Sequence, residues 1–134
     1  PYTLLNQEPL ENIFLECQKR GMGVIIGAPY ASGILATGAS SEARYGYAPV
    51  EESVLNRVKA IEKVCREHKI LMKAAALQFP LGHPLVASVI PGAMHPDQVR
   101  DNLAMMKHPI PETFWRDLKN EGLLHPEAPV HTND

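Results

Sequence analysis

The sequence contains 134 residues, of which 45% are hydrophobic and 21% are charged. A chain of this length and composition can form one modest globular domain with a hydrophobic core. The formal net charge of -2 gives no electrostatic basis for binding nucleic acid or an anionic membrane, and no apolar run approaches the length of a membrane span. No signal peptide is recognisable, although one could have been cleaved upstream because the first residue is not Met, and we expect a cytoplasmic location.

The cysteines and histidines give no indication of a metal site or a disulfide. Cys17 and Cys65 each lie on the apolar stripe of a predicted helix, which favours buried structural thiols over a disulfide in a reducing compartment. The six histidines are scattered and show no H-E-x-x-H spacing, and C-x-x-C is absent. We therefore predict no bound metal.

The first part of the chain has the order of a parallel α/β unit. Residues 1–5 predict the end of a strand and residues 6–9 a turn, and apolar residues at helical spacing predict a helix over 10–20. Gly21 is a suitable stop for that helix. Residues 22–29 then predict a buried strand, because the run is short, apolar and ended by proline.

Residues 30–48 predict a long irregular stretch rich in glycine, serine and threonine. Two interpretations remain open for a segment of this kind. One is a cover over a ligand at the carboxyl end of the preceding strand, and the other is a mobile surface loop. The segment from Ala28 to Gly38 reads A-P-Y-A-S-G-I-L-A-T-G, which is more specific than its composition alone.

Three helices are predicted in the remainder. An amphipathic pattern covers 49–69, a second helix with many alanines covers 71–81, and a last helix covers 111–123. His83 lies between helix breakers on the amino-terminal side of the next strand, so a loop histidine is favoured over a catalytic one. The segment 125–134 is proline-rich and polar, and we expect it to be extended or disordered.

The segment 86–102 predicts a strand, a tight turn and a helix. Val86–Ile90 is a short β-branched run, Pro91-Gly92 ends it, and Pro96 suits the first turn of a helix. That helix carries an apolar stripe of Val99, Leu103 and Met106 beside a polar face of Gln98, Asp101 and Asn102. The free amides at its start form a natural anion site, and the polar first turns suit a nucleotide.

This strand–turn–helix resembles the last βα unit of the aldo/keto reductases, where an I-P-G or I-P-K turn and the following helix hold the adenosine end of a nicotinamide cofactor. The segment from Ala28 resembles the loop that wraps the cofactor's pyrophosphate after strand seven in the aldose and pyridoxal dehydrogenase branch. The resemblance implies cofactor contacts by Tyr30, Ser32, Gly33, Leu35, Ile90, Pro91, Gly92, Ala93, Gln98, Asp101 and Asn102.

The resemblance covers nearly the whole chain and implies an α/β fold. Residues 1–124 would form the C-terminal portion of a (β/α)8 TIM barrel, from the end of strand six to the final helix, followed by the polar tail 125–134. A barrel needs all its strands to close, so this portion would leave sheet edges open. We therefore expect it to belong to a longer protein, or to pair with a second copy or with its missing N-terminal half.

The resemblance implies hydride transfer between a nicotinamide and an aldose or aldehyde carbonyl. The family's catalytic tyrosine, lysine, aspartate and histidine lie on earlier strands, and no position here matches them, so we assign no catalytic residue. We expect the isolated chain to lack dehydrogenase activity and to be a poorly behaved monomer. The alternative is a non-catalytic truncated barrel that serves as a binding or assembly module, and the residues upstream of Pro1 would distinguish the two.

The same resemblance favours NAD over NADP. Members that use NADP often carry a lysine just after the I-P pair and an arginine on the first helical turn, where this chain has Gly92 and Gln98. Asp101 on the same face would repel a 2′-phosphate. Two further positions depart from the family, because Gly27 replaces an aromatic residue that often stacks on the nicotinamide and Ala93 replaces a frequent serine.

Overall fold

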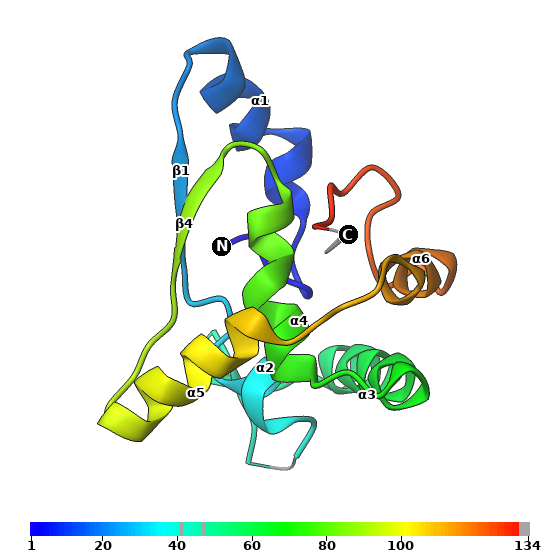
Figure 1. Ribbon diagram of the computed structural model, residues 1–134. Coiled ribbons are helices and arrows are strands. Elements are labelled where there is room, and N and C mark those ends of the chain that lie inside the picture. Colours follow the sequence, from blue (N-terminus) through cyan, green and yellow to red (C-terminus); the bar gives the residue numbers. More distant parts are fainter. Residues whose placement is uncertain (41, 47, 132–134) are drawn as a thin grey trace.

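The computed structural model describes residues 1–40, 42–46 and 48–131, and a two-stranded parallel sheet lies along one side of the molecule (Figure 1). Strands β1 (Val24–Gly27) and β4 (Val86–Ile90) pair with Ile26 beside Val89 and Gly27 beside Ile90. The parallel pairing confirms the α/β unit predicted from the order of helix, glycine and strand. A helix-rich segment of nearly sixty residues connects the two strands, as parallel pairing requires a crossover.

Helix α4 (Met72–Gln78) packs behind this sheet and is almost fully buried. Its three consecutive alanines, Ala74 to Ala76, are completely inaccessible, so their small side chains allow close approach of the surrounding elements. The predicted single helix over 71–81 is wrong at its end, where a 3-10 turn, η2 (Phe79–Gly82), takes over. Pro80 explains the change, because proline has no amide hydrogen to continue the α-helical pattern.

The N-terminal segment also differs from its prediction. Residues 1–5 form no strand, because the backbone of Thr3 pairs with that of Asn6 in an isolated bridge that closes a tight turn. The helix predicted over 10–20 is divided into a 3-10 turn, η1 (Glu8–Glu11), and α1 (Ile13–Lys19). Asn12 separates the two, and its side-chain oxygen accepts a hydrogen bond from the amide of Ile13, which caps α1.

The stretch predicted as irregular contains regular elements. They are α2 (Ile34–Thr37) and a hairpin of β2 (Arg44–Tyr45) and β3 (Ala48–Pro49). Ile34 and Leu35 are 1% and 0% exposed and anchor α2 in the core. This anchoring contradicts a wholly irregular stretch and argues against a mobile surface loop at α2, while the cover over a ligand stays a prediction. Ser41 and Tyr47 lie outside the described residues.

Helices α3 (Glu52–His68) and α6 (Glu112–Asn120) form the other side of the core, close to their predicted positions. The side chain of Arg57 donates to the carbonyl of Leu123 over 2.7 Å, and His68 contacts Asp117 at the same distance. Because α3 and α6 are far apart in sequence, these contacts and the buried faces beneath them fix the helices side by side.

The two thiols differ in their environment, and both are free. Cys65 on α3 is buried as predicted, and this burial, with the nearby Glu62, raises its pKa to about 12. Cys17 on α1 is partly exposed, so the prediction of a buried thiol is wrong there. The outer side of α1 has no cover among the described residues, which leaves Ile13 and Leu15 about half exposed.

Helix α5 (Pro96–Lys107) begins at the predicted proline but turns an unexpected face to the core. Asn102 and Met105 are buried, whereas the predicted apolar stripe of Val99, Leu103 and Met106 is 50%, 59% and 39% exposed. The reason is the position of α4, which covers the face of α5 that carries Asn102 and leaves the stripe uncovered.

The strands were predicted to be buried, and this is correct for one face only. Ile26 and Val86 are covered by the helices, but Ile25 and Ile90 are 61% and 59% exposed. Continuous apolar runs are typical of strands that are covered on both faces. Figure 1 shows the reason for the difference, since α1, α4 and α6 all lie on the same side of β1 and β4.

The C-terminal segment is held against the helices. Residues 125–131 form neither helix nor strand, but Ala128 is buried and the indole nitrogen of Trp115 donates to the carbonyl of His131 over 3.1 Å. The amide of Ala128 donates to the carbonyl of His125 and closes a turn, so the segment is not wholly extended, and the predicted disorder is contradicted for these residues. Residues 132–134 lie outside the described part, and the boundary after residue 124 stays a prediction. Within the described residues, no helix has the length and apolarity needed to cross a membrane.

Candidate functional site

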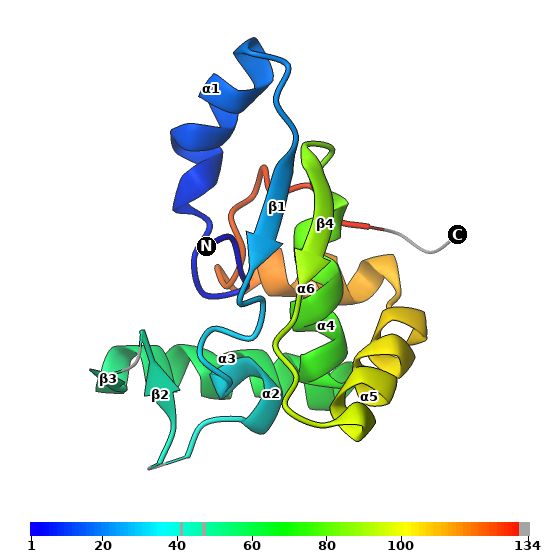
Figure 2. The same ribbon diagram turned by 90° about the vertical axis from the view of Figure 1, so that its left-hand side faces the viewer.

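The carboxyl ends of β1 and β4 lie at the same end of the sheet, as parallel pairing requires (Figure 2). The loop that begins at Ala28 leaves β1 there, and the turn of Pro91 and Gly92 leaves β4 beside it. Ligands of α/β proteins bind preferentially at this end of a parallel sheet, where the loops after neighbouring strands meet. Both segments that the sequence singled out therefore converge.

A buried hydrogen bond joins the two segments directly. The hydroxyl of Tyr30 in the first loop donates to the side-chain oxygen of Asn102 on α5 over 2.7 Å. Tyr30 is 9% exposed and Asn102 is 7% exposed, so both side chains are shielded from water, and this hydrogen bond gives each polar group a partner. The sequence predicted a site role for each residue, but contained no signal for their contact across 72 positions.

The environment of Tyr30 makes it a poor proton-transfer group. Burial, and then the negative charge of Asp101, raise the pKa of Tyr30 to about 12. The ammonium of Lys73 lies 5.3 Å from the centroid of the tyrosine ring, over its face. Tyr30 therefore remains protonated near neutral pH, as its role as hydrogen-bond donor requires.

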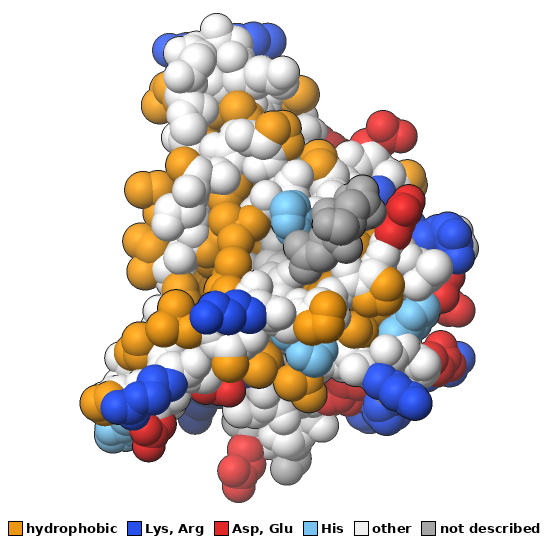
Figure 3. Space-filling model, viewed as in Figure 1, with side chains coloured by type: hydrophobic (Ala, Val, Ile, Leu, Met, Phe, Trp, Pro, Cys, Tyr) orange, Lys and Arg blue, Asp and Glu red, His pale blue; other side chains and the backbone are white. Residues whose placement is uncertain are grey.

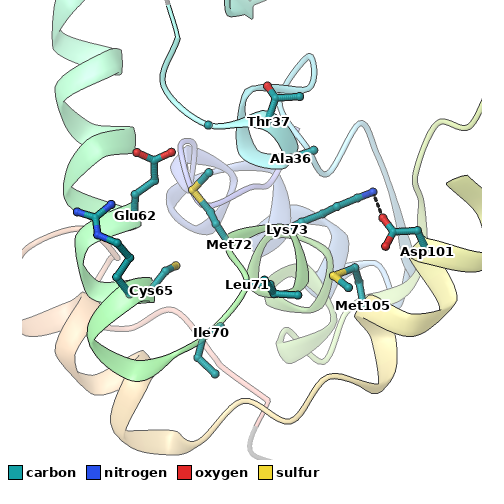
Figure 4. A pocket seen from close by; sticks show the side chains of 12 residues that line it. Ala36, Thr37, Glu62, Cys65, Ile70, Leu71, Met72, Lys73, Asp101 and Met105 are labelled. Carbon is teal, nitrogen blue, oxygen red and sulfur yellow. Dashed lines mark hydrogen bonds and ion pairs between the residues drawn. The ribbon is translucent and has the colours of Figure 1, made fainter.

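Lys73 also forms an ion pair with Asp101 and links α4 to α5 (Figure 4). Both side chains line a cavity of about 460 Å³ together with Thr37 on α2 and residues of α3. Sequence analysis missed Lys73. Its partner is 28 positions away, so no local spacing could have identified the pair.

The start of α5 is capped by one of the predicted site residues. The side-chain oxygen of Gln98 accepts hydrogen bonds from the amides of Met94 and His95, at 2.6 and 3.2 Å. This satisfies two donors at the positive end of the helix, where Pro96 occupies the first turn. Any ligand contact of Gln98 therefore uses its side-chain nitrogen or displaces the cap.

The loop after β1 has an unusual backbone. Ala28, Ala31 and Ser32 have φ values of 50°, 49° and 60°, in the left-handed region that residues other than glycine rarely adopt. The amide of Gly46 donates to the hydroxyl of Ser32 over 3.1 Å, which ties this loop to the β2–β3 hairpin. Such strain is characteristic of ligand-binding loops that the surrounding packing holds in place.

The other predicted site residues differ in exposure. Gly92, Ala93 and Ile90 lie at the surface, whereas the side chain of Leu35 is fully buried, so only its backbone could reach a ligand. A side chain added at Gly33 or Gly92 would meet no atom within 4 Å. These glycines therefore leave room for close approach of a ligand to the backbone.

The donor set of this end of the sheet suits a nucleotide better than a metal ion. Among the described residues, no three His, Cys, Asp or Glu side chains are grouped closely enough to hold a metal. Asp101 can accept from ribose hydroxyls or an amino group, and the helix start after Gly92 suits an anion. The residues present therefore fit the adenosine and phosphate groups of a dinucleotide.

A parallel β-α-β arrangement with candidate ligand groups at the carboxyl ends of the strands defines an α/β protein, and it occurs both in α/β barrels and in open α/β sheets. The model of the aldo/keto reductase family matches residues 1–120, so this chain belongs to the aldo/keto reductase family.

Two curated relatives agree with this assignment. A pyridoxal 4-dehydrogenase of Microbacterium luteolum is 36% identical over 123 residues, and a D-threo-aldose 1-dehydrogenase of a Pseudomonas species is 32% identical over 124 residues. Each match covers 92% of this chain, but only 36% and 38% of the respective relative. The chain thus spans well under half the length of either.

Solved structures extend the comparison to the fold. The apo and holo forms of an aldo-keto reductase from Bacillus halodurans superimpose with TM-scores of 0.69 and 0.67, at 25% and 26% identity. They cover 98% of this chain, which in turn covers 44% and 43% of theirs. The prediction of a barrel portion is confirmed in this form, while its exact limits within a barrel stay a prediction.

Proposed function

We propose that this chain is the cofactor-binding side of an NAD(P)-dependent aldo/keto reductase that acts on an aldose or aldehyde carbonyl. The nicotinamide, when bound, supplies or accepts the hydride. The residues of this chain bind and orient the dinucleotide, and the proton-transfer group comes from the rest of the barrel. The family membership and the two dehydrogenase relatives support this reaction class.

The observation that carries the proposal is the hydrogen bond between Tyr30 and Asn102. It brings the loop after β1 and helix α5 into contact at the carboxyl end of the sheet, where a single extended ligand can touch both. The polar groups of α5 would hold the adenosine, and the backbone around Gly33 would contact the pyrophosphate. A ligand that spans two such segments is better matched by a dinucleotide than by a small sugar.

We further propose that NAD is preferred over NADP. Gly92 and Gln98 offer no cation to a 2′-phosphate. Nearby cations are already paired with carboxylates, Arg100 with Asp97 over 2.6 Å on the exposed side of α5 and Lys73 on α4 with Asp101. An unpaired phosphate would cost roughly 2 kcal/mol, which corresponds to about a thirtyfold loss of affinity.

The test is kcat/KM of the complete protein with each cofactor at a matched aldose concentration. We expect NAD to exceed NADP by about thirtyfold, and the double variant Gly92→Lys, Gln98→Arg to shift the ratio toward NADP. Asn120→Arg on the exposed end of α6 is the matched control and should leave the ratio unchanged.

Two results would contradict parts of the proposal. Equal efficiency with both cofactors, unaffected by the double variant, would show that the turn after Ile90 does not read the ribose. A complete protein that binds neither NAD nor NADP would reject the oxidoreductase and favour the non-catalytic binding module.

A further inference from the structure

Lys73 connects the two segments of the candidate site. Its ammonium pairs with the carboxylate of Asp101 on α5 and lies 5.3 Å from the ring centroid of Tyr30 in the loop after β1. Tyr30 in turn donates to Asn102, the neighbour of Asp101. A single cation on α4 therefore interacts with both segments to which cofactor binding is assigned, and Figure 4 shows its ion pair with Asp101.

The position of Lys73 distinguishes it from the surface lysines. Its side chain is 23% exposed and that of Asp101 is 47% exposed, whereas Lys63 and Glu67 on α3 form an ion pair that is 64% and 58% exposed. A partly covered charge between a carboxylate and an aromatic face is screened less by water and has fewer alternative conformations. Its charge therefore acts on its neighbours more strongly than that of an exposed lysine.

The charge of Lys73 matters because Asp101 faces a site proposed for an anion. A dinucleotide carries negative phosphates, and an uncompensated carboxylate beside it would weaken binding. With Lys73 present, the net charge of the pair is zero. Without Lys73, the pair becomes one negative charge, and a ligand with an additional 2′-phosphate would suffer most.

We propose that Lys73 is a positioning residue that holds Asp101 and compensates its charge, and thereby sets how strongly the site discriminates between NAD and NADP. The inference rests on the proposed function. It adds a determinant on α4, a helix that carries none of the residues predicted for the site. Lys73 acts through Asp101 and Tyr30, not through the reacting atoms.

The experiment measures dissociation constants of NAD and NADP by isothermal titration calorimetry on the complete protein. Lys73→Met removes the charge and keeps the length of the side chain. We expect NAD to bind about threefold more weakly and NADP at least about tenfold more weakly. Lys73→Arg should retain wild-type affinities, because it restores the cation.

Two further variants separate charge compensation from structural damage. Lys73→Met combined with Asp101→Asn should bind NAD more tightly than Lys73→Met alone, since both charges are then absent. Asp101→Asn alone leaves Lys73 uncompensated and should strengthen NADP binding, which tests the same idea without altering α4. Lys63→Met is the matched control and should change neither constant.

Unchanged constants in Lys73→Met would overturn the inference, as would equal losses for both cofactors that Asp101→Asn fails to restore. Weaker NADP binding in Asp101→Asn alone would overturn it as well. These outcomes leave the proposed function intact when the wild-type protein binds NAD. A wild-type protein that binds neither cofactor would reject the proposed function and this inference together.

Discussion

Helices α5 and α6 are both amphipathic, but they meet opposite environments. In α6 the apolar stripe of Phe114, Trp115 and Leu118 is at most 1% exposed. In α5 the apolar stripe is largely exposed, and the buried face carries the polar Asn102, whose oxygen is used by Tyr30. The same helical periodicity therefore corresponds to a buried apolar stripe in α6 and to an exposed one in α5.

The uncovered stripe of α5 is part of a larger apolar groove. The groove has a volume of about 370 Å³ and lies between α4, β4 and α5, where Figure 3 shows hydrophobic side chains gathered at the surface. Its lining includes Leu77, Leu81, Val89, Val99, Leu103 and Met106. This chain covers less than half of the solved structures it resembles. The packing of α6 is therefore complete within this chain, whereas the exposed stripe of α5 is a surface that the rest of a barrel would cover.

The largest expected effect is a difference between two leucines. Leu118→Ala on α6 should lower the free energy of unfolding of the 134-residue chain by about 2–5 kcal/mol, because it leaves a cavity at a fully buried position. Leu103→Ala on α5 removes the same atoms from a side chain that is 59% exposed and should change it by less than about 0.5 kcal/mol. Urea denaturation of both variants measures the contrast.

The same two variants can also be compared in the complete protein. If the remaining strands cover α5, Leu103→Ala should cost about 2 kcal/mol or more there, in contrast to the isolated chain. Equal and large losses for both leucines in the isolated chain would mean that the stripe of α5 is already buried, and the comparison would fail.

The second effect concerns the cover of α6. A Cβ at Gly82 would lie 2.7–2.8 Å from backbone atoms of Pro129, Val130 and His131, closer than real contacts allow. Gly82→Ala should therefore displace the C-terminal segment from Trp115 and cost roughly 1–3 kcal/mol. Gly23→Ala, whose new atom would have its nearest neighbours at 3.9 Å, is the control. Amide exchange of residues 126–131 reports the displacement, and unchanged protection would argue against it.

The smallest effect is a dependence on pH on the covered side of the sheet. The ring of His83 lies 4.6 Å from that of Phe14, and burial lowers the pKa of His83 below its usual value of 6.5. The unfolded chain then binds more protons as the pH falls below about 6.5, so stability is present above that pH and is lost below it.

His83→Gln should reduce this loss between pH 7 and pH 5, by a slope of at most about 1.4 kcal/mol per pH unit. Thr113→Gln, at an exposed position of α6 without a titratable group, is the control and should leave the slope as it is. Denaturation of the variants at several pH values measures both slopes. Identical slopes in His83→Gln and wild type would show that His83 does not cause the loss of stability at low pH.

Local patterns predicted much of the fold. The stripes of α3 and α6, the start of α5 at Pro96 and the parallel strands follow from periodicity and from turn residues that act over a few positions. Some errors arose where tertiary contacts decided the outcome. The burial of Asn102, for example, depends on Tyr30. A different kind of error concerns the helix over 71–81, because Pro80 is a local signal for its end that the apolar pattern concealed.

The candidate site was predicted to a similar extent. The sequence identified Tyr30, Asp101 and Asn102 through their resemblance to a family, and the structure brings them together. Lys73 could not be predicted, because its contacts with Asp101 and Tyr30 depend on how α4 packs against two distant segments. The role of Gln98 as a helix cap was visible in principle from its position three residues after His95, but the family pattern drew attention to a ligand role instead.

The central claim is that the loop after β1 and the start of α5 bind one dinucleotide. Hydrogen–deuterium exchange of the complete protein, with and without saturating NAD, tests it most directly. We predict that NAD increases protection in residues 28–35 and 90–102 together, and leaves residues 112–120 of α6 unchanged. Protection in only one of the two segments, or in neither while NAD binds elsewhere, would contradict the claim.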